Sequence, residues 1–140
     1  MTRRAPIGGV PLFDPAEGTT IMRPEMDAPG YWVGAPALWL DDDKLYLSVR
    51  HRRPLSDGRG WKSAIYRVHS VTELEEIWTC SASQLGTASI ERSALVHVPD
   101  GPWRYYISYL DPTDGRWRID LLEAGSITDF DVARRVPVLD

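Results

Sequence analysis

Apolar and polar positions along this chain alternate in short segments. Residues 45–50, LYLSVR, alternate strictly, and a short apolar segment, residues 36–40, precedes them across the acidic turn 41–44. Such a pair is typical of a β-hairpin. No segment keeps an apolar period of 3.6 residues over a helical length, so the pattern indicates an all-β fold. The strands predicted in this half are residues 36–40, 45–50, 61–68 and 76–79, with a turn or short helix over 70–74.

The pattern of the first half recurs in the second. Asp57-Gly-Arg-Gly-Trp61 returns as Asp114-Gly-Arg-Trp117, with the tryptophans 56 positions apart, and Ser70 returns as Ser126 at the same offset. Residues 89–126 read as three further strands joined by turns. A four-stranded unit recurring at this spacing is typical of a β-propeller blade. The sequence therefore predicts an extended lead-in over 1–30, a first four-stranded antiparallel blade over 31–85 and a second over 86–140.

A single β-sandwich or open barrel of about eight strands has similar strand spacing and stays open as an alternative. The likeness of the two halves favours blades, because a sandwich does not require its halves to resemble each other. Two blades cannot close a ring, and their terminal faces would expose apolar surface. We therefore expect the chain either to continue into further blades or to self-associate. Trp61 and Trp117, at equivalent places in the repeat, are expected in the core.

Composition narrows the class of protein. The 140 residues carry a formal net charge of −4, with 43% hydrophobic and 26% charged residues, which is typical of one soluble domain. The negative charge argues against a nucleic-acid partner. Without a membrane-length apolar run or a signal-type apolar core near Met1, we expect no membrane partner and a cytoplasmic location. Cys80 is the single cysteine and the three histidines are scattered, so neither a metal site nor a cofactor is expected.

Three segments, 34–36, 50–60 and 86–92, are similar to the N-terminal blades of five-bladed propellers related to glycoside hydrolase families 43 and 32. The resemblance covers about residues 31–140 and implies a partial five-bladed propeller with a carbohydrate ligand. Family members use an Asp general base, an Asp that adjusts the pKa of the acid, and a Glu general acid. The base usually precedes a proline at the start of the innermost strand. Here that place reads Ala35-Pro36, so whether the chain is an enzyme stays open.

Blade connectivity predicts which side chains meet, because the loops before the first strand and between the second and third strands open on one rim. Carboxylates beside aromatic rings on such a rim suit a sugar, since the acids serve the glycosidic oxygen and the rings its apolar face. The acidic turn 41–43 belongs to the opposite rim. The candidates are Glu91 and Asp27 for catalysis, and Tyr31, Trp32, Arg50, Arg52 and Asp111 for substrate binding.

Each candidate also has a structural interpretation. Glu91 can be an ion-pair anchor at a strand start, and residues 50–53 can clamp acidic neighbours or hold a carboxylate-bearing sugar. Three classes of function remain: a glycosidase propeller with paired carboxylates, a non-catalytic carbohydrate-binding protein, and a structural assembly protein. The absence of an Asp at position 35 favours the second.

Overall fold

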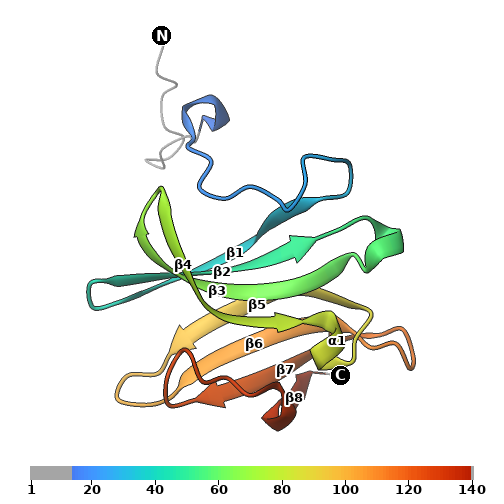
Figure 1. The fold of residues 1–140 in the computed structure, drawn as a ribbon. Helices are drawn as coiled ribbons and strands as arrows, with labels where there is room; N and C mark the ends of the chain where they lie inside the picture. The colour runs from blue at the N-terminus through green and yellow to red at the C-terminus, as the bar shows by residue number, and fades with distance from the viewer. Residues whose placement is uncertain (1–13, 140) are drawn as a thin grey trace, which may run out of the picture.

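The computed structural model describes residues 14–139, so most of the first half of the predicted lead-in lies outside the described residues. Two four-stranded antiparallel sheets lie one above the other (Figure 1), and in each sheet every strand pairs with its neighbour in sequence. This confirms the predicted all-β fold. The first sheet comprises β1 (Trp32–Asp41), β2 (Lys44–Arg52), β3 (Gly60–Ser70) and β4 (Glu73–Ser81), and the second β5 (Ser89–His97), β6 (Trp103–Leu110), β7 (Trp117–Ala124) and β8 (Val136–Leu139).

The strands are longer than the sequence pattern predicts. Only Val71 and Thr72 separate β3 from β4, and they form a turn, one of the two alternatives predicted over 70–74. The short helix α1 (Ala82–Leu85) follows β4. The Ser81 side chain accepts from the Gln84 backbone N–H while the Gln84 side chain accepts from the Ser81 N–H, which forms a capping box at the helix start.

The sequence repeat does not extend to the fourth strand of the second sheet. Residues 125–135 cross to the outer edge through an irregular segment and the 3₁₀ turn η3 (Val132–Arg134) before β8 begins. Ile127 and Phe130 in this segment are buried in the core between the sheets. The Trp78 indole N–H donates to the Phe130 carbonyl oxygen at 2.9 Å, which fixes the segment against the first sheet.

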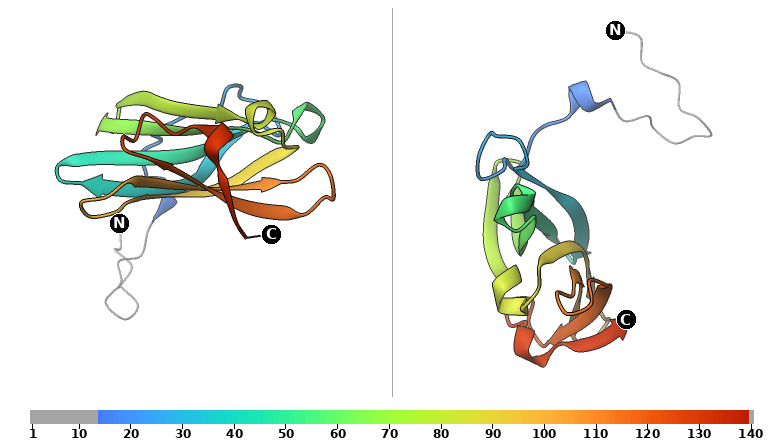
Figure 2. Two further views of the ribbon diagram at one scale, coloured as in Figure 1. Left: turned by 90° about the horizontal axis from the view of Figure 1, so that it is seen from below. Right: turned by 90° about the vertical axis from the view of Figure 1, so that its right-hand side faces the viewer.

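The core lies between the two sheets, which Figure 2 shows from two further directions. On β6, alternate residues from Trp103 to Tyr109 are buried, because they point toward the first sheet, while the residues between them point away. Ile65 and Trp78 of the first sheet meet this face. A β5 carbonyl and the first residue of β3 approach so closely that a Cβ at Gly60 would lie 1.8 Å from the Ile90 oxygen.

The outer faces of the two sheets differ. Leu47 and Val49 on the outer face of the first sheet are buried, and Met22 of the lead-in packs against them. Glu25 holds the lead-in in place through two charged hydrogen bonds from Arg53, at 2.8 and 2.9 Å. The outer face of the second sheet instead exposes large apolar side chains. They are Trp117 on β7 and Val136 and Val138 on the edge strand β8.

The two equivalent tryptophans do not share one environment, and neither belongs to the core as the repeat predicts. Trp117 is 51% exposed on the outer face of the second sheet. Trp61 is partly buried, with the Arg53 guanidinium 3.8 Å from its ring centroid. The difference follows from the lead-in, which covers the first sheet and has no counterpart on the second.

Candidate functional site

The first strand of each sheet carries a bulge at the same place. In β1 the register shifts between Gly34 and Ala37, and in β5 it shifts between Ile90 and Ser93. Two residues fall inside each bulge, Ala35-Pro36 in the first sheet and Glu91-Arg92 in the second. A bulge breaks the regular alternation and re-aims side chains, so Glu91 leaves the strand pattern that would otherwise orient it. The place where the resembling families carry a base, Ala35, and the place of Glu91 are therefore structurally equivalent.

Glu91 is bound to the other sheet. Its carboxylate forms an ion pair with the Arg50 guanidinium, whose side chain is 10% exposed against 31% for Glu91. Arg50 lies near the end of β2 on the face turned toward the second sheet, like Tyr46 and Ser48 on the same strand. The Glu91 carboxylate thus neutralises a largely buried charge and anchors the strand start, as the structural interpretation expects.

An exposed aromatic ring stands next to this pair. Trp32 opens β1, pairs with Arg52 across the β1–β2 ladder and is 55% exposed. The Arg52 guanidinium carbon lies 4.6 Å from the Trp32 ring centroid, within cation–π range. Arg52 and Arg50 are two residues apart on one strand and therefore share a face. Trp32, Arg50, Arg52 and Glu91 form one group, which we call the rim site.

Positive charge predominates at the rim site. Burial lowers the pKa of Arg50, and the neighbouring charges of Arg52, Arg59 and Arg92 lower it further. Burial, followed by the charge of Arg59, also lowers the pKa of Arg52. Glu91 is the one carboxylate paired with these arginines among the residues that the structure describes.

The other predicted site residues do not join the rim site. Asp111 accepts from the Thr113 backbone N–H and from Arg118 Nε, each at 2.8 Å, and these bonds hold the pKa of Asp111 below its usual range. Asp27 is exposed in the lead-in. Tyr31 is partly buried just before β1, where its backbone N–H donates to the Ala28 oxygen. Asp111 therefore stabilises its own loop, and the structure does not pair Asp27 with Glu91.

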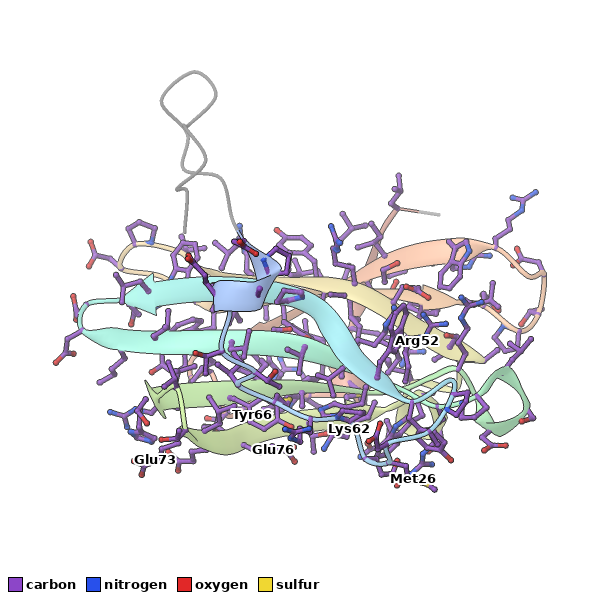
Figure 3. The ribbon with its side chains drawn as sticks, turned by 90° about the horizontal axis from the view of Figure 1, so that it is seen from above. Met26, Arg52, Lys62, Tyr66, Glu73 and Glu76 are labelled. Atoms are coloured by element: carbon purple, nitrogen blue, oxygen red, sulfur yellow. The ribbon has the colours of Figure 1, made fainter. Side chains whose placement is uncertain are left out.

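A second polar group lies on the outer face of the first sheet. Figure 3 shows Lys62, Tyr66 and Glu76 close together there, with Arg52 apart from them beside β1. Lys62 Nζ and the Tyr66 hydroxyl each donate to Glu76 at 2.7 Å, and His51 Nε2 lies 3.1 Å from the Tyr66 hydroxyl. Burial raises the pKa of Tyr66, so this hydroxyl stays protonated as a donor. This polar group therefore lies on the same outer face of the first sheet as the lead-in.

The rim site contains one carboxylate, that of Glu91, among the residues that the structure describes. Glycosidic hydrolysis by either stereochemical course uses two carboxyl groups facing each other across the bond. Here one carboxylate is held by Arg50 and the equivalent bulge position carries the methyl group of Ala35. Within residues 14–139, no group of three or more His, Cys, Asp or Glu could hold a metal ion. The same part of the chain contains no helix long and apolar enough to cross a membrane.

The spacing of the repeat also relates the two bulges in the sequence. Counted back from the tryptophans of the repeat, Glu91 is 26 residues before Trp117 and Ala35 is 26 residues before Trp61. This spacing aligns the two positions directly. The pairing of Glu91 with Arg50, in contrast, depends on how the sheets pack and has no local sequence pattern.

No protein-family model matches this chain, and no curated protein matches its sequence. The solved structures that match its fold include two enzymes of glycoside hydrolase family 43. One is a GH43_1 enzyme from Xanthomonas citri complexed with xylose, with a TM-score of 0.57 and 14% identity over 80% of this chain and 33% of that one. The other, from a compost microbial metagenome, is a GH43 β-xylosidase/α-arabinofuranosidase in complex with xylotriose, with a TM-score of 0.56 and 16% identity over 85% of this chain and 37% of that one.

At these identities the likeness concerns the fold. The two sheets are two blades of a propeller like that of glycoside hydrolase family 43, which excludes the sandwich and barrel alternatives. The chain spans about a third of the length of the structures that it matches.

Proposed function

We propose, on the premise that the two sheets are blades of a family 43-like propeller, that this chain binds carbohydrate at the rim site without hydrolysing it. The observation that carries the proposal is the exposed Trp32 ring beside the Arg50–Glu91 pair, where the two blades meet. An aromatic face next to fixed polar groups is the usual composition of a sugar subsite, because a sugar ring has an apolar face and a polar edge.

Several contacts support recognition over catalysis. The Glu91 carboxylate already has a charged partner, and Asp111 is engaged by Arg118 and its own loop. Asp27 sits in the lead-in with no hydrogen bond or ion pair to the rim site among the described residues. The blades that would bring further carboxylates to a closed propeller are not among the residues 14–139. A glycosidase requires a second carboxyl group placed opposite the first.

Neutral pentose oligosaccharides are the first ligands to test, because the matching structures hold xylose and xylotriose. Calorimetric titration with xylan, arabinan and fructan oligosaccharides compares the unaltered chain with Trp32→Ala. We expect the substitution to weaken binding about fivefold or more, since stacking on an aromatic face contributes about 1 kcal/mol or more.

Two variants provide matched controls. Trp117→Ala removes a tryptophan of similar exposure from the outer face of the second blade, and Asp43→Ala changes the turn at the opposite rim. Both should bind as the unaltered chain does. Equal losses from Trp32→Ala and Trp117→Ala would refute the rim site as the binding surface. Turnover of aryl xylosides that Glu91→Gln abolishes would refute the non-catalytic assignment.

We infer further that the outer face of the second blade is covered in the functional protein by another blade, from this chain or from a second copy. Val136 and Val138 are more than half exposed there, on a sheet whose opposite face packs against a blade. Propeller blades bury both faces against neighbours. Sedimentation of the isolated chain should show association that Val138→Glu reduces, and a monomer at every concentration would contradict self-association.

A further inference from the structure

The rim site holds more positive charge than its own residues neutralise. Arg50 is 9% exposed and carries a buried Nε that finds no hydrogen-bond acceptor in the part of the chain that the structure describes. Arg52 Nε is buried and without an acceptor in the same part of the chain. A buried donor left unpaired costs about 1–3 kcal/mol, and more when the group is charged. An arrangement of this kind is stabilised when an anion joins it.

Two further arginines extend the charge toward solvent. Arg59 ends the β2–β3 loop and Arg92 follows Glu91 in the β5 bulge, and both are exposed. Their charges reach Arg50, whose pKa they lower. Four arginines thus lie near one another, with Arg50 buried and paired with Glu91, and with Arg59 and Arg92 exposed to solvent. An anion arriving from solvent meets the exposed pair first.

Open space lies beside Gly34, the residue that pairs with the buried Arg50. Gly34 pairs directly with Arg50 in the β1–β2 ladder, so the two residues face the same side. A Cβ built on Gly34 would meet no atom within 4 Å. The space directly over Gly34, on the side that Arg50 faces, is therefore not filled by other side chains of the described chain.

From these contacts we propose that the rim site selects carbohydrates that carry a carboxylate, namely uronic-acid-bearing oligosaccharides, over neutral ones. Trp32 stacks on the apolar face of the sugar while Arg52 and Arg59 bind the carboxylate. A guanidinium presents a planar fork of N–H donors that matches the two oxygens of a carboxylate. Glu91 bound to Arg50 already shows a carboxylate held in this group. The inference rests on the proposed carbohydrate-binding function and narrows its ligand.

The test compares ligands that differ only in the carboxyl group. The probes are xylotetraose, xylotetraose with one glucuronic acid substituent, the methyl ester of that substituted sugar, and a sulfated xylotetraose, each titrated into the full chain by calorimetry. We expect the free acid to bind at least tenfold more tightly than its ester and than xylotetraose. The preference should shrink as salt rises, because charge–charge attraction is screened.

Variants separate this inference from the general function. Arg59→Gln should abolish the preference for the acid while binding of xylotetraose persists. Arg52→Gln, within the rim site, should also abolish the preference, and Arg116→Gln, in the β6–β7 loop, should leave the affinity for both sugars unchanged. Gly34→Leu fills the space on the side that Arg50 faces without removing charge and should also reduce acid binding. These variants avoid truncating the buried Arg50, and circular dichroism checks their folding.

The outcomes are distinct. Equal affinity for acid, ester and neutral sugar, all lost in Trp32→Ala, overturns the selectivity and leaves carbohydrate binding intact. Equal affinity for the sulfated and carboxylated sugars overturns the assignment to carboxylates. No binding of any of the four probes overturns both proposals.

Discussion

Replacing Tyr105 with Phe tests the polar link at the centre of the interface between the blades. The Tyr105 hydroxyl is fully buried and contacts three serine hydroxyls, at 2.8 Å for Ser48 and 2.6 Å for both Ser63 and Ser93. Burial raises the pKa of Tyr105, so the phenol remains protonated and able to donate. One donor and two acceptor sites on a phenol are filled by three partners. Ser48 and Ser63 belong to the first blade, while Ser93 and Tyr105 belong to the second.

The size of the expected loss in stability depends on which hydrogen bonds each serine keeps in Tyr105→Phe. Ser48 and Ser93 still bond each other at 2.8 Å, whereas the Ser63 hydroxyl has no other side-chain partner among residues 14–139. An orphaned buried hydroxyl costs about 1–3 kcal/mol, and each of the other lost bonds contributes about 0.5–1.5 kcal/mol. We expect Tyr105→Phe to lower the free energy of unfolding by about 2–6 kcal/mol.

Equilibrium urea unfolding, followed by tryptophan fluorescence, measures this loss. Ser63→Ala alone should cost about 1 kcal/mol, and the double variant should cost about 1 kcal/mol less than the sum, because neither partner is then buried alone. Tyr106→Phe, on the outer face of the same strand, is the control and should change stability by less than about 0.5 kcal/mol. A loss below about 0.5 kcal/mol in Tyr105→Phe, or strict additivity in the double variant, would refute the reasoning.

Three further predictions concern other contacts. Gly60→Ala should destabilise the chain by about 1–3 kcal/mol, because its Cβ meets the Ile90 oxygen. Gly125→Ala, whose Cβ meets nothing within 4 Å, should be nearly neutral in the same unfolding assay. Equal effects of the two substitutions would contradict the close approach at Gly60. Arg135→Ala should lower the free energy of unfolding by about 2–3 kcal/mol, because the Asp120 carboxylate, only 2% exposed, loses its ion pair at 2.9 Å. Thermal unfolding measures this loss, with Arg134→Ala as the control. Burial and, after it, the charge of Lys62 lower the pKa of His51, so its contribution to stability is present above about pH 6.5 and is lost as pH falls. His51→Gln should therefore flatten the decline in stability between pH 7 and 5, and an unchanged slope would contradict this assignment.

The strands were predictable because their chemistry is local. Strict alternation marked β2 and the repeated turn residues located the second sheet, so the pairing of neighbouring strands followed. The helix α1 was also within reach, since Ser81 and Gln84 have the spacing of a capping box. The fourth strand of the second sheet was not predictable, because the sequence likeness of residues 126 and 70 is confined to a turn. Phe130, which follows that turn, is buried in the core between the sheets.

The candidate site was predictable only in part. Loop connectivity predicted Trp32, Arg52 and Arg50 on one rim, and the register of β1 on β2 places Trp32 opposite Arg52, two residues from Arg50. It did not predict that Arg118 would hold Asp111 or that the partner of Glu91 would be Arg50. These pairings are decided by side-chain packing between elements far apart in sequence, where a one-residue change in register changes every contact.

The matched bulges at Ala35 and Glu91 have an evolutionary consequence. Ala35 has a φ of 54°, a left-handed conformation that aspartate and asparagine adopt more readily than most residues, so a carboxylate fits the existing backbone there. The bulge thus fixes where the side chain at this position lies, while a single codon determines whether that side chain is a carboxylate. A carboxylate can therefore be gained or lost at this bulge by one codon change, without any change in the strands around it.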